Sequence, residues 1–181
     1  MREGYVERLE DRVPSGAEVV ELGCGTGLPV AERLARRYRY VGVDISAEMV
    51  RPAEANVPQG RFRVADMRDV EFPAGSLGAV VAFYSIIHVT RRDQAGLFAR
   101  IRSWLRPGGL FVACLTAGDL PGGWEDDWLG GGPMFWSGYD TDTNLGLLEE
   151  AGFEVVWSEV HTQMERETEE RFLWVEAQRP Q

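Results

Sequence analysis

The sequence contains no lysine, so its 19 basic residues are all arginines. The lysine that a phosphate-binding P-loop requires is therefore missing. The Tyr-x-x-x-Lys pair of many nicotinamide-dependent dehydrogenases is missing for the same reason. Cysteine is scarce as well. Cys24 and Cys114 form neither a C-x-x-C pair nor a zinc-binding pattern, and we expect both to be small packed residues.

Long apolar runs and an excess of positive charge are also absent. No uninterrupted apolar segment approaches the length of a membrane span, and residues 1–4 do not resemble a signal peptide, so we expect a cytoplasmic protein without membrane contact. Acidic residues outnumber basic ones 29 to 19, for a net charge of −10. Such a chain repels a polyphosphate backbone, which argues against a nucleic-acid partner. The length of 181 residues suits one domain, and we expect residues 1–181 to form a single one.

The sequence does contain a regular alternation of short apolar runs and helical patterns. Strands are expected at residues 18–22, 40–44, 61–65, 79–84, 110–115, 153–160 and 172–178. Helices are expected at residues 28–38, 47–55, 91–105 and 143–151, with a short helical segment at 5–11. This alternation predicts an α/β protein, in which a mostly parallel, doubly wound sheet lies between two layers of helices.

The first expected strand runs directly into a glycine-rich turn. Gly23, Gly25 and Gly27 form G-x-G-x-G, and Leu28 stands where the dinucleotide fingerprint G-x-G-x-x-G requires its third glycine. A glycine turn between strand and helix lets the backbone approach a ligand closely and points helix amides at it. The next strand ends in Asp44, which is placed to accept hydrogen bonds from two ribose hydroxyls. The pattern predicts a nucleoside cofactor and disfavours a loop that cradles a pyrophosphate.

Five ordered segments resemble those of the class I S-adenosylmethionine-dependent methyltransferases of the small-molecule type. They are E-L-G-C-G-T-G (21–27), V-G-V-D-I-S (41–46), A-D-M (65–67), V-V-A-F-Y-S-I-I-H-V (80–89) and L-R-P-G-G-L (105–110). The resemblance implies a Rossmann-like sheet of seven strands in the order 3-2-1-4-5-7-6, with strand 7 antiparallel. It implies S-adenosyl-L-methionine as methyl donor, S-adenosyl-L-homocysteine as product, no metal, and in-line transfer to a small-molecule acceptor. A cofactor-binding module of the same fold without catalysis is the alternative.

The same resemblance implies which residues contact the cofactor. The backbone of residues 23–27 would hold the methionyl end, Asp44 the ribose and Asp66 the adenine amine, while the carbonyl of Phe83 would accept from the ammonium group. The full expected set is Glu21, Gly23, Cys24, Gly25, Gly27, Asp44, Ile45, Asp66, Met67, Phe83 and Tyr84. Three alternatives stay open: Asp44 is also suited to a turn at the strand end, Asp66 is also suited to begin a turn, and the two aromatic residues are also suited to the core.

The acceptor side depends on a histidine and a long segment. His88 follows the fourth expected strand, and an ordinary imidazole titrates near neutrality, so it is the candidate catalytic base for a hydroxyl or protonated amine. A histidine that caps or packs against the following helix is the alternative. Residues 117–139 are rich in glycine and aromatics, and we expect an insertion that forms a lid and an acceptor wall. The candidate acceptor contacts are His88, Trp124, Trp128, Met134, Phe135, Trp136 and Tyr139. An aromatic cluster that covers the sheet edge is the alternative for this segment.

The first expected strand begins at residue 18. Many small-molecule relatives carry extra N-terminal helices that close over the cofactor, and we expect this lid to be nearly missing here. We expect one of three arrangements to replace them: the 117–139 segment alone, a second subunit in a homodimer, or a more exposed cofactor.

Overall fold

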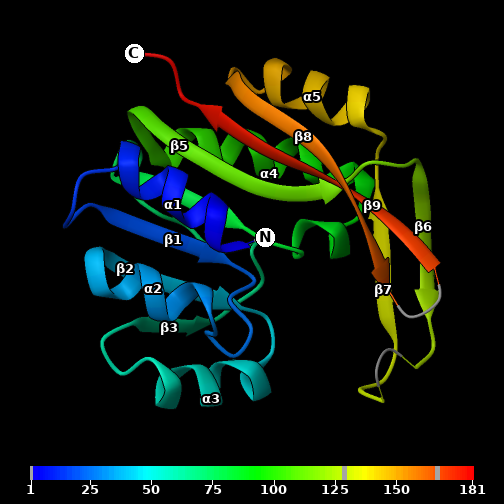
Figure 1. Ribbon diagram of the computed structural model, residues 1–181, viewed down its shortest axis with the longest axis horizontal. Coiled ribbons are helices and arrows are strands. Elements are labelled where there is room, and N and C mark those ends of the chain that lie inside the picture. Colours follow the sequence, from blue (N-terminus) through cyan, green and yellow to red (C-terminus); the bar gives the residue numbers. More distant parts are fainter. Residues whose placement is uncertain (1, 128–129, 166–167) are drawn as a thin grey trace.

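A computed structural model describes residues 2–127, 130–165 and 168–181, and its main feature is a seven-stranded sheet (Figure 1). The strand order is β3-β2-β1-β4-β5-β9-β8. The strands are β1 (Glu18–Leu22), β2 (Arg39–Asp44), β3 (Arg61–Val64), β4 (Leu77–Ala82), β5 (Leu105–Thr116), β8 (Glu154–Glu165) and β9 (Thr168–Gln178). The strands from β3 to β5 pair in parallel, whereas β9 runs antiparallel to both β5 and β8. The expected Rossmann-like order, with an antiparallel last strand, is confirmed.

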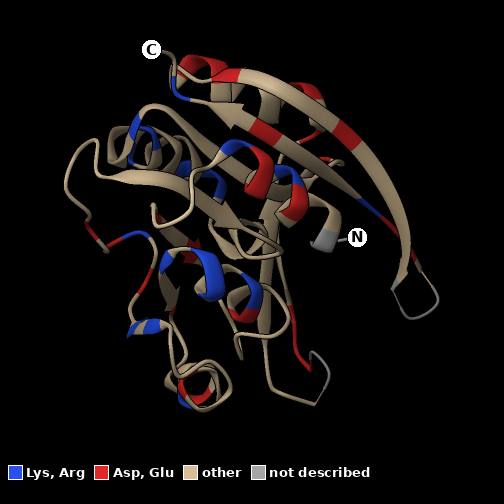
Figure 2. Ribbon diagram, turned by 60° about the vertical axis from the view of Figure 1, so that its left-hand side comes forward, with Lys and Arg blue, Asp and Glu red and all other residues tan. Residues whose placement is uncertain are grey.

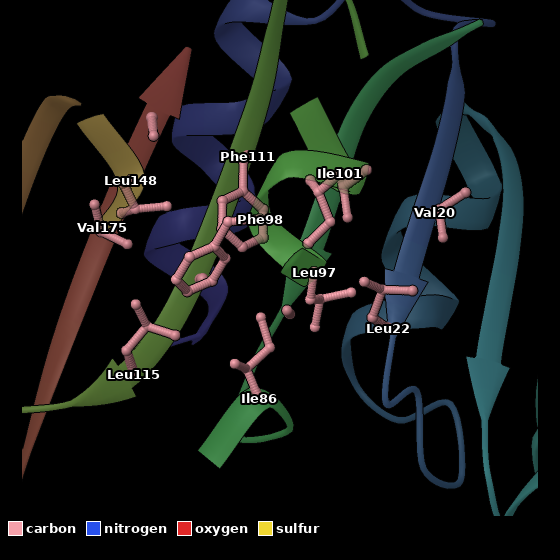
Figure 3. Packing of buried hydrophobic residues seen from close by; sticks show 14 of the residues in the cluster. Val20, Leu22, Ile86, Leu97, Phe98, Ile101, Phe111, Leu115, Leu148 and Val175 are labelled. Atoms are coloured by element: carbon pink, nitrogen blue, oxygen red, sulfur yellow. The ribbon is translucent and has the colours of Figure 1, made fainter. Parts of the chain in front are cut away.

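Helices cover both faces of this sheet. On one face lie α1 (Arg2–Arg12), α2 (Val30–Arg37) and α3 (Ala47–Asn56), and on the other lie α4 (Arg91–Trp104) and α5 (Thr141–Glu150) (Figure 1). The central strand β4 is buried along its whole length, as a parallel strand between two helical layers must be. Phe98 of α4, Phe111 of β5 and Leu148 of α5 pack together in the core of the second face (Figure 3). In the part of the chain that the structure describes, no helix has the length and apolarity needed to cross a membrane.

Helix α2 begins later than the sequence pattern predicts. Leu28, expected as the first residue of this helix, lies outside it and is 48% exposed. The reason is Pro29, which forms the helix N-cap, because the residue before a proline is kept out of the helical region. Leu28 is thus left at the surface, directly after the glycine turn.

Two hairpins project from the strand ends. Within the 117–139 segment, β6 (Leu120–Glu125) and β7 (Met134–Gly138) form a separate antiparallel pair. The strands β8 and β9 are longer than expected, because their pairing continues to Glu165 and Thr168, through residues that lie between the two expected strands. Residues 168–171 of β9 are exposed and mostly charged, so they show none of the apolar alternation that marks a strand in a sequence.

Helix α1 is fastened to the last strands. The ring of Tyr5 stacks on that of Trp174 in β9, with centroids 4.1 Å apart and planes at 8°. The buried carboxylate of Glu176, 1% exposed, is paired with Arg8 and Arg12 of α1. Basic and acidic residues intersperse along this helix, while acidic positions mark both strands of the long β8–β9 hairpin (Figure 2). The N-terminal segment is therefore a packed part of the fold.

Candidate functional site

The candidate site lies where four adjacent parallel strands end. The glycine turn follows β1, Asp44 ends β2, Asp66 follows β3 and Phe83 follows β4. Since these strands are neighbours in the order β3-β2-β1-β4 and run parallel, their carboxyl ends meet at one edge of the sheet. Ligands of open α/β sheets bind at such an edge.

The glycines of the turn serve different purposes. The amides of Gly23 and Cys24 donate to the Val43 carbonyl, at 2.7 and 3.1 Å, and so tie the turn to β2. Gly23 has φ +79°, and a side chain there would overlap Ser85, whose hydroxyl donates to the Leu22 carbonyl at 2.6 Å. Gly25 also has positive φ, but no atom lies within 4 Å of where its side chain would be. Packing therefore requires Gly23, whereas Gly25 faces open space that a ligand can enter.

The carboxylate of Asp44 is held by two backbone amides. Its Oδ2 accepts from Gly25 N at 2.8 Å and its Oδ1 from Ser46 N at 2.9 Å. A carboxylate oxygen has two acceptor positions, so each oxygen keeps one for a ligand donor. The adjacent Ile45 is an apolar side chain that is 69% exposed. Such a side chain offers an apolar surface on which a base could lie. This donor and acceptor set fits the ribose and base of a nucleoside.

A buried polar pair lies beneath the glycine turn. Glu21 is 4% exposed, and its Oε2 accepts from the Tyr40 hydroxyl at 2.5 Å. Burial and the nearby Glu21 carboxylate raise the pKa of Tyr40 well above its ordinary value and also raise the pKa of the buried Cys24 thiol. Cys24 is thus a packed, protonated thiol. Tyr40 is a residue of the site that the sequence analysis missed, and its pairing with Glu21 has no local sequence signal.

Asp66 is engaged by an arginine that the sequence analysis also missed. Its carboxylate accepts from the guanidinium of Arg68, closest at 2.6 Å between Oδ2 and Nη2, and from the Arg68 amide at 2.8 Å. These hydrogen bonds hold the pKa of Asp66 below its ordinary value. The Asp66 carbonyl accepts from the amides of Asp69 and Val70, so the residue does begin a turn. Met67, within that turn, is partly buried against the core.

The aromatic pair after β4 packs into a cluster with β9. Phe83 is buried beside Trp174, with ring centroids 5.2 Å apart. Tyr84 adopts φ +56° and packs edge-on against Phe172 at 5.0 Å. Its hydroxyl donates to Oε1 of Gln163 in β8 at 3.0 Å. The side chains thus match the core alternative, while their backbone remains at the strand ends.

His88 ends a 3₁₀ turn, η1 (Ile86–His88), that packs into the apolar cores on both faces of the sheet. Ile86 is buried on the α4 side of the sheet (Figure 3) and Ile87 on the α1 side. The Nδ1 atom of His88 lies 2.8 Å from the carbonyl oxygen of Phe135, and its ring lies 4.5 Å from that of Trp136. Burial lowers the pKa of His88, opposed by the Phe135 hydrogen bond and by the charge of Asp44. The influence of Asp44 indicates that His88 and the Asp44 carboxylate lie in the same region.

The aromatic residues of the 117–139 segment divide into three groups. Trp136 lies against His88, whose Nδ1 contacts the backbone carbonyl of Phe135, as described above. Trp124 is 68% exposed and packs on Phe135, 5.4 Å between centroids, and the partly buried Met134 pairs with Glu125 near the open end of the hairpin. Tyr139 follows β7 and lies against Arg91 of α4, whose guanidinium is 4.7 Å from its ring. Trp128 lies outside the described residues.

Taken together, the doubly wound sheet, the open Gly25 and the oriented Asp44 are the arrangement expected of an α/β protein that binds a nucleoside. Residues 19–109 match the family profile described as "Methyltransferase domain". An uncharacterized methyltransferase of Mycobacterium tuberculosis (strain ATCC 25618 / H37Rv) is 34% identical over 146 residues, covering 67% of this chain and 72% of that relative. The chain therefore belongs to the class I S-adenosylmethionine-dependent methyltransferase family.

Two further comparisons extend this assignment. Trans-aconitate 2-methyltransferase of Azoarcus sp. (strain BH72) is 39% identical over 105 residues, which are 56% of this chain and 40% of that relative. The crystal structure of a SAM-dependent methyltransferase from Methanosarcina mazei has a TM-score of 0.82 and 17% sequence identity, covering 96% of this chain and 97% of the other. The structural likeness shows that the fold is shared over nearly the whole chain.

Proposed function

We propose that this protein transfers a methyl group from S-adenosylmethionine to a small-molecule acceptor that carries a dissociable proton, with His88 as general base. The observation that carries the proposal is the contact between His88 Nδ1 and the Phe135 carbonyl at 2.8 Å. A carbonyl oxygen can only accept, so Nδ1 carries the hydrogen and Nε2 of the neutral ring keeps a lone pair. Residues 1–181 would act as one domain, with residues 117–139 forming the acceptor side.

The cofactor-binding roles follow the geometry of the strand ends. The open backbone at Gly25 would take the methionyl end, Asp44 the two ribose hydroxyls, and Ile45 one face of the adenine. The Met67 amide and Asp66 would meet the adenine edge. The Asp66 carboxylate would then accept from the adenine amine as well as from the Arg68 guanidinium. The bound cofactor supplies a methyl group that is already activated by the sulfonium for in-line displacement.

His88 would hold the acceptor proton at Nε2. Because burial lowers the pKa of His88 below its ordinary value of 6.5, the ring is neutral and able to accept a proton at neutral pH. A base of this kind is needed only where the acceptor retains its proton at the working pH, as a hydroxyl or a protonated amine does. The neighbouring Trp136 excludes water from one side of the ring. The expected acceptor is therefore a hydroxyl or amine compound.

A small acceptor suits the walls around His88. The Trp136 ring and the Phe135 carbonyl form one wall, and Tyr84, bound to Gln163 of the β8–β9 hairpin, lies at the end of β4. The printed name of the Azoarcus relative, trans-aconitate 2-methyltransferase, supports a small metabolite as acceptor. The net charge of −10 counts against nucleic acid.

The test is an acceptor screen with product detection. The protein is incubated with S-adenosylmethionine and a panel of small hydroxyl and amine metabolites, and S-adenosylhomocysteine is measured by mass spectrometry. We expect product with at least one acceptor, and a strong loss in His88→Gln at unchanged S-adenosylhomocysteine affinity. Cofactor binding without product across the whole panel would favour a non-catalytic module. Full activity of His88→Gln would remove His88 from the mechanism.

A further inference from the structure

Strand β7 is docked onto the His88 turn by two buried polar side chains. Gln94 of α4 and Ser137 of β7 are each 1% exposed. Gln94 Nε2 donates to the Val89 carbonyl at 2.8 Å, and Ser137 Oγ donates to the same oxygen at 2.7 Å. A longer contact of 3.5 Å joins Gln94 Nε2 to the Ser137 carbonyl. Val89, the residue after His88, is therefore the point at which both side chains meet.

The end of β7 is held as well. Arg91 donates twice to the Gly138 carbonyl, from Nε at 2.9 Å and from Nη2 at 2.6 Å, and also pairs with Asp119. A side chain at Gly138 would overlap that of Thr116, so β7 packs directly on the end of β5. Thr116 in turn donates to the Tyr139 carbonyl at 2.7 Å. These contacts make β7 a docked arm, which differs from the hinged lid that a glycine-rich segment suggests.

The docked arm carries the partner of His88. Phe135 and Ser137 are two residues apart in β7, so the position of one determines the position of the other. The Phe135 carbonyl accepts from His88 Nδ1, and Trp136 between them lies 4.5 Å from the imidazole ring. A small movement of β7 would therefore change both the hydrogen bond and the burial of His88.

We propose that Gln94 and Ser137 are positioning residues, which fix the Nδ1–H tautomer and the dry environment of His88 by holding β7 against η1. This inference rests on the proposed role of His88 as a base, and it deepens that role. Neither side chain touches the reacting atoms. Both act through the Val89 carbonyl and the Phe135 carbonyl.

The groups around His88 determine in which direction its pKa should change when β7 is loosened. Strand β7 carries no charged residue, β5 carries only Arg106 at its far end, and α4 begins with Arg91, Arg92 and Asp93. Burial, the largest influence, lowers the pKa of His88, while the hydrogen bond to the Phe135 carbonyl and the charge of Asp44 in β2 raise it. Loosening β7 weakens the Phe135 hydrogen bond and hydrates the ring, and because burial is the larger of the two influences the pKa of His88 rises toward 6.5. The same change frees the ring to populate the Nε2–H tautomer, which cannot accept a proton at Nε2.

The experiment is a nitrogen-15 NMR titration of histidine-labelled protein without cofactor or acceptor. The chain has two histidines, so His161→Gln assigns the His88 signals. In the unmodified protein we expect Nδ1 protonated, Nε2 unprotonated and a pKa below 6.5. Ser137→Ala and Gln94→Met should each raise that pKa and add the Nε2–H tautomer. The matched control is Ser103→Ala, which removes an exposed serine hydroxyl that likewise donates to a backbone carbonyl, that of Arg100 at 2.7 Å.

The outcomes separate this inference from the proposed function. Tautomer and pKa changes in Ser137→Ala, absent in Ser103→Ala, support the positioning role, and the pH profile of methyl transfer should shift in the same direction. Ser137→Ala removes a single oxygen, so it remains informative if Gln94→Met fails to fold. Signals of His88 identical to the unmodified protein in a folded Ser137→Ala would overturn the inference, whatever the activity. Altered signals with unchanged product formation would instead refute His88 as the base.

Discussion

The backbone amide of Gly25 donates to Oδ2 of Asp44 at 2.8 Å, which joins the glycine turn after β1 to the acidic end of β2. The other carboxylate oxygen accepts from the Ser46 amide at 2.9 Å. Asp44 is thus oriented by the protein itself, before any ligand contributes. The turn and the acid form one preformed unit, in which a ligand would pay little additional ordering entropy.

The two glycines nearest this unit should respond differently to alanine. Gly23→Ala forces a side chain into Ser85 at φ +79°, and we expect a loss of about 2–4 kcal/mol in the free energy of unfolding, from overpacking and backbone strain together. Gly25→Ala meets no protein atom, so we expect a loss of only about 1–2 kcal/mol from its φ of +53°. Urea unfolding measures both.

For ligand affinity, Gly25→Ala should be the more harmful of the two substitutions. The alanine methyl group at Gly25 would occupy the open space above the turn, so S-adenosylhomocysteine affinity should fall by about tenfold or more. Calorimetry on folded Gly25→Ala is the measurement. Unchanged affinity would mean that the open side of Gly25 does not face the ligand.

The pH dependence of methyl transfer should follow His88. Since its pKa lies below 6.5, the rate should be low in acid, rise as the ring loses its proton, and level off before neutral pH. His88→Gln should lower kcat by about 10²- to 10⁴-fold for an acceptor that keeps its proton, and abolish this acid limb. His161→Gln is the matched control, because His161 bonds to Tyr5 at 2.9 Å, on the α1 side. An acid limb that survives in His88→Gln would assign the titration to another group.

The ion pairs that hold α1 should contribute measurably to stability. Glu176 is buried, while Arg12 and Arg8 are 35% and 45% exposed at their side chains. Arg12→Met leaves the carboxylate with Arg8 alone at 3.5 Å, and we expect a loss of about 1–3 kcal/mol, below the value for a fully buried pair because both arginines reach solvent.

Two variants check that interpretation. The double variant Arg12→Met/Glu176→Gln should recover part of the loss, because it removes the unpaired charge. Arg36→Met, which breaks an exposed pair with Glu32, should change stability by less than about 0.5 kcal/mol. Equal effects of Arg12→Met and Arg36→Met in urea unfolding would show that burial of Glu176 adds nothing.

Much of the fold could be predicted from local patterns. The glycine turn, the apolar run before it and Asp44 lie close together in the sequence. The backbone freedom of glycine explains why the chain turns sharply at the end of the apolar strand. The strand order followed from the family resemblance, and the structure confirms it. Leu28 was misplaced because its apolar character fitted the helix face, whereas Pro29 excluded it from the helix.

The remaining parts of the site depend on contacts between distant residues. The hydrogen bond from Tyr84 to Gln163 joins residues 79 positions apart, and that from His88 to Phe135 joins residues 47 apart. Neither produces a periodicity or a motif. Arg68 is close to Asp66 in the sequence, but nothing in A-D-M-R tells whether the arginine turns toward the carboxylate. The extended β8–β9 hairpin was missed because its outer residues are charged, while its stability comes from pairing with one another.

The most direct test of the account is calorimetric titration of the protein and of Asp44→Asn with S-adenosylhomocysteine. We predict one site with a dissociation constant on the order of micromolar or tighter for the unmodified protein. Asp44→Asn should bind about 10- to 100-fold more weakly, because its amide nitrogen cannot accept from a ribose hydroxyl or from the Gly25 amide. Asp11→Asn, an acid-to-amide change on the exposed side of α1, should bind as the unmodified protein does. No heat and no thermal shift with the unmodified protein, or equal affinity of Asp44→Asn, would contradict the account.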